Sequence, residues 1–407
     1  MFTYAYLALV GAREIEGRKL CNRVTADFPN NKRRGGPGVQ YPCSQRSGQQ
    51  GAALVTTLLI VALITITVTT MTTRQQLSMQ RAGNRQVQTQ MVNLIGAGEK
   101  FAMAVLRRDR VEGERNNSDS TEDFWAQSLP PVPVDGATVE GCVIDLHGKF
   151  NLNNLVDIEG NTSPPEFEQL RLLLSALAID TQKAESILDW IDPNIDTTGT
   201  DGAEDDFYTG QTPPYRAANG PMVSPTELLL VKGFRVVDKG GLDDYDTLLP
   251  HIATLPTGTA VNVNTASSAV LASLADYMSE VSDDLKVVDD GYWQNFPDCP
   301  EGGGLLDTLL NDESGDEAAP DDGSAGDEEG DEGQNSFVYD NIEQFKQDAR
   351  GDTEEETVDN ANITVSSQHF LSRVTVTRDE SSVTQYTVLF RDNTGALQTL
   401  RRSRGGL

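Results

Sequence analysis

The stretch that decides the fold is Gly51 and the twenty residues after it, AALVTTLLIVALITITVTTM, residues 52–71. These twenty residues carry no charge, and the first ionisable side chain beyond them is Arg74. An uncharged run of this length can cross the ~30 Å hydrocarbon core of a bilayer as a helix. Because lipid offers no partner to backbone groups, a helix is the expected conformation. The many threonines predict a helix that can also leave the bilayer and pack against protein.

Residues 1–51 precede this run and hold eight basic and three acidic residues among many Gly, Pro and Asn. Positive charge before an apolar run keeps that side of the membrane protein in the cytoplasm. A secretory signal would have its cleavage site after the apolar core, whereas Gly51 stands directly before it. The simplest interpretation of residues 1–51 is a disordered leader; alternatively, translation starts inside this stretch.

The sequence Gln49-Gln50-Gly51 followed at once by an apolar helix resembles the class III leader of type IV pilins and type II secretion pseudopilins. In that family a prepilin peptidase cuts after the glycine on the cytoplasmic side, which implies Ala52 as the first mature residue. Two positions depart from the family pattern. The first mature residue is Ala52 rather than Phe or Met, and the fifth, usually Glu, is Thr56.

Without the three acidic and eight basic residues of the leader, 59 acidic and 24 basic residues remain, a net charge of −35. Such an acidic chain repels nucleic acid and anionic membrane surfaces and favours divalent cations. Roughly 300 residues lie beyond the helix that begins with this run, enough for two modest cores. Two cysteines remain, Cys142 and Cys299, which form a possible disulfide if this part is periplasmic; the sequence does not decide the pairing.

After residue 71 the chain becomes amphipathic, with apolar residues at spacings of three and four. They are Leu77, Val87, Met91, Leu94, Ile95, Phe101, Ala102, Val105 and Leu106. The pattern predicts one helix over residues 52–108, in lipid at its start and on a globular body at its end. An anchor followed by a coiled-coil stalk is the alternative. Alternating residues predict strands over 137–146, 370–378, 382–391 and 396–402, and helices are expected over 165–177 and 183–191.

A series of short motifs begins at His147. In order they are GKFNLNNL (148–155), DWID (189–192), GAED (202–205), Tyr208, PYR (214–216), AN (218–219), SPTEL (224–228), VKG (231–233), LP (255–256) and VNVNTA (261–266). Behind a pilin-like helix, this ordered set closely resembles the minor pseudopilin K family of type II secretion systems, general secretion pathway protein K (GspK). The resemblance covers most of residues 51–280 and the C-terminal strands, and Thr56 fits it because that family also lacks the fifth-position Glu.

The resemblance implies an α+β protein with a type IV pilin-like fold, in which a long N-terminal helix packs on an antiparallel sheet that carries a large inserted all-helical domain. The implied divisions are a leader (1–51), the long helix (52–108, with 52–71 transmembrane), the first part of the pilin-like domain (109–150), the inserted helical domain (151–290), an acidic low-complexity loop (291–340) and the rest of the sheet (341–407).

The same resemblance implies the function and the partners. Family members cap the pseudopilus of a type II secretion system and help to initiate it, for export of proteins across the outer membrane. The implied partners are minor pseudopilins I and J at the tip, the shaft through minor pseudopilin H or major pseudopilin G, and prepilin peptidase. The implied location is the inner membrane, crossed once, with the C-terminal domain in the periplasm. An uncharged Thr56 suits a tip, because the usual carboxylate would have no neighbour's ammonium group to pair with inside lipid.

An acidic stretch, residues 189–206, is the best candidate for a cation site, because hard Ca²⁺ takes six to eight oxygen ligands from flexible loops. It is not an EF-hand, since Thr197 and Ala203 stand where that loop needs Gly and Glu. Family members bind calcium in this domain, which implies structural calcium here. The candidate ligands are Asp192, Asp196, Asp201, Glu204 and Asp205. A solvated acidic loop with Asp192 as a helix cap is the alternative.

Other chemistry finds little support in the sequence. The segment after residue 261 resembles a helix-hairpin-helix module but lacks the Gly-apolar-Gly turn that binds phosphate. Residues 311–334 hold no basic residue and predict a disordered acidic loop. The histidines at 147, 251 and 369 are scattered, so neither a zinc site nor an enzyme is expected. Two alternative functions remain open: a calcium-dependent membrane-anchored binding or adhesin module, and a DNA-uptake pseudopilin exported by a pilin-like route.

Overall fold

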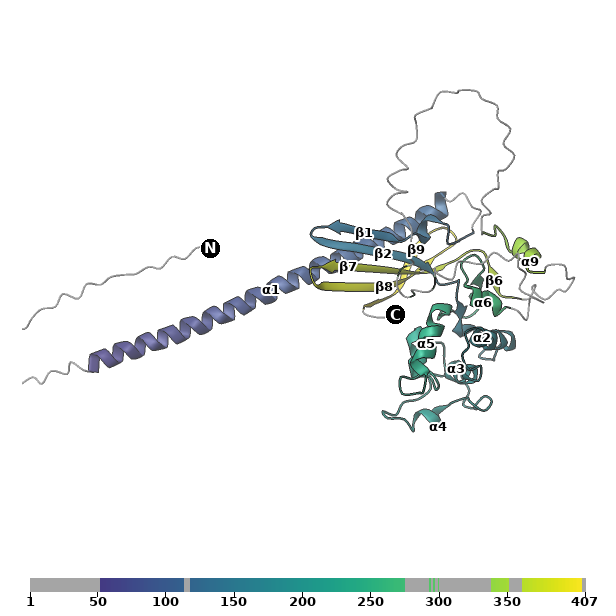
Figure 1. Ribbon diagram of the computed structural model, residues 1–407, viewed down its shortest axis with the longest axis horizontal. Helices are drawn as coiled ribbons and strands as arrows, with labels where there is room; N and C mark the ends of the chain where they lie inside the picture. The colour runs from purple at the N-terminus through teal and green to yellow at the C-terminus, as the bar shows by residue number, and fades with distance from the viewer. Residues whose placement is uncertain are drawn as a thin grey trace, which may run out of the picture. The chain divides into compact units, whose positions relative to one another are not determined.

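The computed structural model describes residues 52–112, 118–274, 293, 296, 299, 338–350 and 361–404. The chain divides into two compact units, Met1–Arg74 and Gln75–Leu407, and each is described by itself (Figure 1). Helix α1 (Ala52–Glu112) begins in the first unit and ends in the second. Gly51 lies outside the described residues, whereas Ala52 is the first residue of α1.

In the first unit, the threonine hydroxyls of α1 form hydrogen bonds within the helix, which makes this Thr-rich helix compatible with lipid. Each of eight hydroxyls donates a hydrogen bond to a carbonyl oxygen three or four residues earlier on the same helix. These are the hydroxyls of Thr56, Thr57, Thr65, Thr67, Thr69, Thr70, Thr72 and Thr73. Their polar hydrogens therefore need no partner outside the helix. Among the described residues, α1 is the one helix long and apolar enough to cross a membrane.

The second unit contains a five-stranded antiparallel sheet in the order β1-β2-β7-β8-β9. Its strands are β1 (Leu129–Val134), β2 (Ala137–Asp145), β7 (His369–Arg378), β8 (Ser381–Arg391) and β9 (Leu397–Arg404). The sequence analysis missed β1, whose three prolines disguise a strand. An Asp135-Gly136 turn with positive φ at both residues connects it to β2, the geometry that matches the twist of a hairpin.

Strands β2 and β7 are neighbours in the sheet although residues 146–368 separate them in sequence. Thr138 pairs with Thr377 at one end of this ladder and Asp145 with Phe370 at the other. The chain therefore leaves the sheet at Asp145 and returns to it at His369. Figure 1 shows the intervening helices gathered beyond that end of the sheet.

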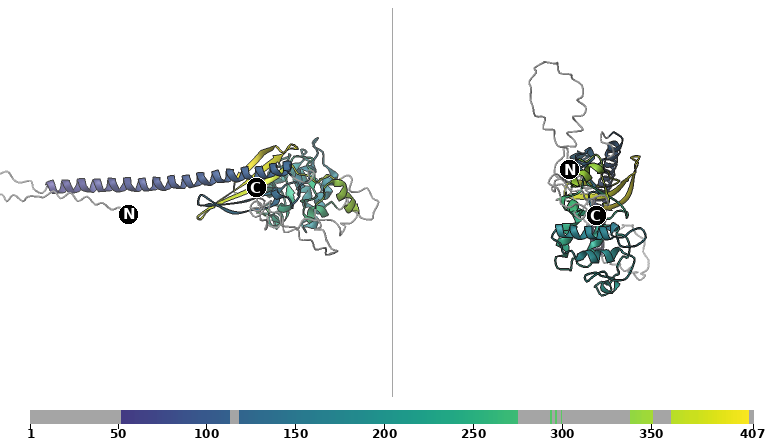
Figure 2. Two further views of the ribbon diagram at one scale, coloured as in Figure 1. Left: turned by 90° about the horizontal axis from the view of Figure 1, so that it is seen from above. Right: turned by 90° about the vertical axis from the view of Figure 1, so that its right-hand side faces the viewer.

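Helix α1 packs on one face of the sheet, as both views in Figure 2 also show. Met91 and Ile95 contact strands β2 and β7, and Leu106 joins a second cluster that includes Phe370. Between these clusters lies Glu99, which accepts hydrogen bonds from Arg402 at 2.6 and 2.8 Å. A buried carboxylate therefore joins the middle of the helix to β9.

The helical portion, which we define as residues 146–274 together with 338–365, has its own hydrophobic core. Its helices are α2 (Pro164–Ala176), α3 (Lys183–Ile191), α4 (Asp205–Tyr208), α5 (Gly241–Leu248), α6 (Ser268–Ala272) and α9 (Ile342–Arg350), with 3-10 turns η2 (Leu152–Leu155), η3 (Pro225–Leu230) and η4 (Leu249–His251). Two short parallel pairs complete it, β3 (Phe150–Asn151) with β4 (Ile252–Ala253) and β5 (Val261–Asn262) with β6 (Ile363–Thr364). A further 3-10 turn, η1 (Phe124–Ala126), precedes β1.

Residues on both sides of position 341, where the rest of the sheet was predicted to begin, pack with the helical portion. Phe345 and Ala349, four residues apart on α9, are buried in the helical core, and so is Tyr339. The side chain of Asn264 also exchanges two hydrogen bonds with the backbone of Tyr339, at 2.8 and 2.9 Å. This contact spans a long stretch of sequence, so local periodicity could not reveal it.

Candidate functional site

The acidic turn, residues 189–206, connects α3 to α4 on the helical portion. Helix α3 ends because Asp192 is in an extended conformation, and the chain then forms a loop that returns at Ala203 and Glu204. Asp192 and Glu204 are 1% and 6% exposed. Two acidic side chains from opposite ends of this turn are therefore withdrawn from water.

The carboxylates of Asp192 and Glu204 carry oxygens that lack hydrogen-bond partners. Both carboxylate oxygens of Glu204 and one oxygen of Asp192 are buried and accept no hydrogen bond from any described residue. Asn219 lies near, but its amide donates to the carbonyl of Asn194 at 2.8 Å. Burial raises the pKa of Glu204 to about 7, and the negative charges of Asp189 and Asp192 act in the same direction. Burial likewise raises the pKa of Asp192 to about 6, with Asp189 again contributing.

Asp189 is a third buried acid that the sequence analysis did not select. Its carboxylate accepts a hydrogen bond from the backbone N–H of Thr198 at 3.0 Å. A Cβ atom at Gly202 would lie 2.3 Å from one of its oxygens, so only glycine allows the turn to close against it. Burial raises the pKa of Asp189 as well. The position of Asp189 in the sequence, at the end of an apolar helix and before a loop that contains glycines, could have identified it.

Three of the predicted ligands have other surroundings. Asp201 forms an ion pair with Lys232 at 2.9 Å, and Asp205 forms one with Arg216 at 3.1 Å. Asp196 is exposed. The structure thus brings Asp192 and Glu204 into one buried acidic environment and leaves the other three at its margin.

The donor chemistry of this turn fits a hard cation, because carboxylate oxygens without partners are the ligands that Ca²⁺ prefers. The fit is incomplete. Among the described residues, no three His, Cys, Asp or Glu side chains are arranged as a metal-binding group. The carboxylates raise one another's pKa, so they are near enough to interact electrostatically, and a cation would relieve that repulsion.

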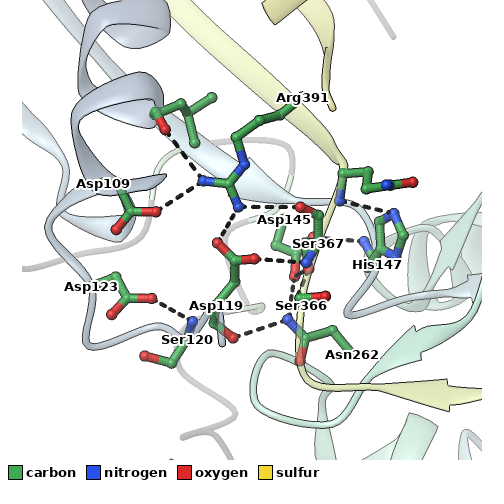
Figure 3. A network of polar contacts seen from close by, with 12 residues as sticks. Asp109, Asp119, Ser120, Asp123, Asp145, His147, Asn262, Ser366, Ser367 and Arg391 are labelled. Carbon is green, nitrogen blue, oxygen red and sulfur yellow. Dashed lines mark hydrogen bonds and ion pairs between the residues drawn. The ribbon is translucent and has the colours of Figure 1, made fainter. Parts of the chain in front are cut away.

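A second polar feature, shown in Figure 3, lies where α1, the sheet and the helical portion meet. At its centre is Arg391, at the end of β8 and 1% exposed. Its guanidinium group pairs with Asp119 and with Asp109 (2.9 Å) and donates to the carbonyl of Ser367 (3.2 Å). Burial raises the pKa of Asp109 to about 6 in spite of this cation, with the charges of Asp123 and Asp119 adding to the effect.

Asp145, at the end of β2, extends this network into the helical portion. It is fully buried and accepts hydrogen bonds from the hydroxyls of Ser367 and Thr265 (both 2.6 Å) and from the amide of Asn262 (3.1 Å). Figure 3 shows Asp119, Asn262 and Ser367 converging beside it. The network therefore fixes the helical portion to the strands from which it departs.

The sequence analysis treated the three histidines as scattered, yet two of them stack. His147 and His369 have ring centroids 5.3 Å apart and share a hydrogen bond of 3.1 Å. Both rings are nearly fully buried. Burial lowers the pKa of each to about 4. His147 follows the end of β2 and His369 begins β7. The pairing of these two strands brings the histidines together, and the sequence alone does not show that pairing.

Cys142 and Cys299 are joined by a disulfide, with Cα atoms 5.6 Å apart. Near it, the buried ammonium group of Lys149 lies over the rings of Trp293 and Phe296, 4.6 and 3.3 Å from their centroids. These contacts attach Trp293, Phe296 and Cys299 to β2 and to Lys149, the residue before β3. Most of the predicted acidic loop, residues 291–340, lies outside the described residues.

Comparison with known proteins identifies the relatives of this chain. Residues 148–257 match the family model for type II secretion system protein K. Type II secretion system protein K of Pseudomonas aeruginosa is 35% identical over 237 residues, which cover 56% of this chain and 69% of that protein. The protein K of Aeromonas hydrophila is 32% identical over 262 residues, covering 61% and 76%.

A solved structure shares the fold. A chain of the GspK–GspI–GspJ complex from the type 2 secretion system of enterotoxigenic Escherichia coli superposes with a TM-score of 0.57 at 21% identity. The match covers 80% of this chain and all of that one. This likeness confirms the expected combination of a long N-terminal helix with an antiparallel sheet in a mixed helix-and-sheet fold.

Proposed function

The chain belongs to the type II secretion system protein K family, and from this premise we propose that it caps the pseudopilus of such a system and helps to start its assembly. The observation that carries the proposal is the 35% identity to protein K of P. aeruginosa over 69% of that protein's length. The role is that of a non-enzymatic assembly subunit, a minor pseudopilin, in the export of proteins.

The structure supports a subunit that docks through its helix. In the second unit, α1 covers one face of the sheet. The large apolar side chains of α1 between Leu54 and Met71 are exposed. Such a helix fits insertion first in the inner membrane and then among neighbouring subunits, with the C-terminal part in the periplasm. The partners we propose are minor pseudopilins I and J, in line with the composition of the complex whose chain shares this fold.

Thr56 supports a position at the tip. Its hydroxyl donates to the carbonyl of Ala53 at 2.9 Å and offers no charge to a neighbouring subunit. A shaft subunit needs a carboxylate at this position to pair with the next N-terminal ammonium group, whereas the last subunit has no such neighbour. The large helical portion would also obstruct further growth of the fibre.

We propose that the acidic turn binds structural calcium. The buried, unpartnered oxygens of Asp192 and Glu204 support this proposal, with Asp189 beside them. Asp196 is exposed, and its negative charge contributes to the raised pKa of Asp192. Asp201 and Asp205 would have to leave their ion pairs with Lys232 and Arg216 to contribute. Bound calcium would neutralise carboxylates that otherwise repel one another and would hold the turn closed.

Co-purification with minor pseudopilins I and J in the presence of calcium tests the tip assignment. A stable complex of all three chains is the expected result, since the solved relative comes from such a complex. Failure of the three to associate in calcium would remove the tip assignment. Binding of this chain to a surface ligand without I and J would instead favour an adhesin.

A further inference from the structure

A cavity of about 560 Å³ lies between the sheet and the helical portion, on the opposite face of the sheet from α1. Leu371, Val388 and Leu400 line its sheet side, and Met222 and Val223 line the other. Its volume is in the range of sites that bind ligands or peptide side chains. Val223 and Leu400 are 69% and 53% exposed, so the cavity opens to solvent at β9.

A bulge in β9 turns two consecutive side chains into this cavity. Val388 pairs with Arg401 and Leu389 with Thr399, so Leu400 has no partner in the ladder. Thr399 and Arg402 contact Glu99 on the α1 side, whereas Leu400 and Arg401 line the cavity. Bulges often redirect side chains beside binding sites.

Arg401 gives the cavity a positive charge that the described part of the chain does not neutralise. Its guanidinium group donates to the carbonyl of Val223, and among the described residues it forms no ion pair. Burial lowers its pKa, and the negative charge of Glu227, whose carboxylate accepts hydrogen bonds from the backbone of Val223 and Ser224, opposes this effect. A half-buried cation of this kind is complementary to a carboxylate.

His369 adds an acceptor to the same cavity. His147 donates from Nδ1 to the carbonyl of Ala260 (3.0 Å) and accepts at Nε2 from the backbone N–H of Gln368 (3.3 Å). His369 must therefore donate from Nδ1 to His147, which leaves its own Nε2 as an acceptor. No described residue donates to that nitrogen, although the His369 side chain is 5% exposed and lines the cavity.

The two edges of the sheet differ in their capacity to accept a further strand. The outer strand β1 contains Pro130, Pro131 and Pro133, which lack the backbone N–H that pairing needs. The other edge, β9, has no proline, and no described strand pairs with its outer side. An exposed edge beside an apolar cavity is the arrangement by which proteins bind an extended segment as an added strand.

We propose that this cavity and the outer edge of β9 dock an extended segment of a partner minor pseudopilin, with an apolar side chain in the cavity and a carboxylate on Arg401. The inference rests on the proposed function for the identity of the partner. The expected chemistry of the segment follows from three features of the site. Leu400 calls for an apolar residue, Arg401 calls for a carboxylate, and an edge of β9 with which no described strand pairs calls for an extended conformation.

The test is the affinity of the full chain, in detergent, for minor pseudopilins I and J. Arg401→Glu and Leu400→Asp should each weaken the complex at least about tenfold, since each places a negative charge where a carboxylate must bind. Arg401→Lys should weaken it less, because it keeps the charge but loses the two-pronged geometry. The control is Val237→Asp, a change at a residue that is 81% exposed and does not line the cavity; it should alter affinity by less than about twofold.

Hydrogen exchange on the same samples measures strand addition directly. Amides of residues 397–404 should exchange more slowly in the complex than in the free chain. A complex that forms with all variants equally and leaves these amides unprotected would overturn the inference but not the proposed function. No complex with the wild-type chain would overturn both.

Two other occupants give distinct results. If the amides of β9 exchange faster after residues 303–335 are deleted than in the intact free chain, these residues occupy the edge of β9 themselves, and the inference is wrong. Protection that depends on the concentration of the chain alone would identify a second copy, with the same consequence. Thermal unfolding of each variant shows that a lost interaction is not a lost fold.

Discussion

Arg391 links three parts of the chain through one guanidinium group, which contacts Asp119, Asp109 and the carbonyl oxygens of Leu106 and Ser367. The side chains of Arg391 and Asp119 are 1% and 2% exposed, so the guanidinium group of Arg391 is what compensates the buried charge of Asp119. Removal of one member of a buried ion pair is costlier than loss of the attraction alone, because the other charge stays buried.

We therefore expect Arg391→Ala to lower the free energy of unfolding by about 3–5 kcal/mol. Denaturant unfolding of the detergent-solubilised chain, followed by tryptophan fluorescence, measures this change. Arg171→Ala is the matched control, since Arg171 and Glu168 form an exposed pair at 3.0 Å and should contribute under about 0.5 kcal/mol. A similar loss of unfolding free energy in both variants would show that the network around Arg391 stabilises the fold no more than an exposed ion pair does.

The stacked histidines predict a dependence of stability on pH. The unfolded chain binds protons at histidine near pH 6.5, whereas burial lowers the pKa of His147 and His369 to about 4 in the folded chain. As pH falls from about 6.5 to 4, the unfolded state takes up protons that the folded state refuses, so the free energy of unfolding falls. Asp109 acts in the opposite direction, because its pKa is raised to about 6 and its protonated form favours the folded state.

His369→Asn isolates the contribution of the histidines, because Asp109 is common to both proteins. The variant should lose less stability than wild type between pH 6.5 and 4, by roughly 3 kcal/mol at most, since each unit of pKa difference corresponds to about 1.4 kcal/mol. Chemical unfolding at a series of pH values provides the comparison. Parallel pH profiles for the two proteins would contradict the assignment.

Helices and strands could be predicted from the sequence where their side-chain pattern is local. The apolar spacing predicted a helix over 52–108, and α1 spans Ala52–Glu112. The helix expected over 183–191 is α3, Lys183–Ile191, and the alternating strands became β2, β7, β8 and β9. In each of these, the period of the side chains is visible within one continuous stretch.

Features that depend on contacts between distant residues could not be predicted from the sequence. The prolines of β1 are tolerated because that strand is at an edge, a fact of the sheet and not of the segment. The pairs β3–β4 and β5–β6 are two residues long and parallel, with partners some hundred residues apart, too short for any periodicity. In the acidic turn, composition found the carboxylates but could not show that Lys232 and Arg216 already pair with Asp201 and Asp205.

The disulfide between Cys142 and Cys299 is the covalent connection between β2 and the segment around Trp293. It closes a loop with a sequence separation of 157 residues, so it removes many conformations from the unfolded chain. The double variant Cys142→Ser/Cys299→Ser should lose roughly 2–5 kcal/mol of unfolding free energy. Wild type in a reducing agent should match the variant. Equal stability of oxidised and reduced protein would contradict a structural role for this bond.

Calcium should raise the free energy of unfolding of the whole chain if the acidic turn binds it. A ligand at a hundred times its dissociation constant adds about 2.7 kcal/mol to the free energy of unfolding. Thermal unfolding with and without calcium measures the shift, and Asp192→Asn and Glu204→Gln should abolish it. Asp206→Asn, an exposed change in the same turn, should leave the shift intact. A shift that survives both ligand variants would place the calcium elsewhere.

Processing of the N-terminus tests the central claim, that this is a pilin-class assembly subunit. Ala52 begins the apolar run, so a cut after Gly51 would make this run the N-terminus of the mature chain. N-terminal sequencing of the membrane form, with prepilin peptidase present and absent, is the direct measurement. We expect a chain that starts at Ala52 only when the peptidase is present. An uncut chain in the presence of the peptidase, or a cut after the apolar run, would show that this protein is not processed as a pilin-class subunit.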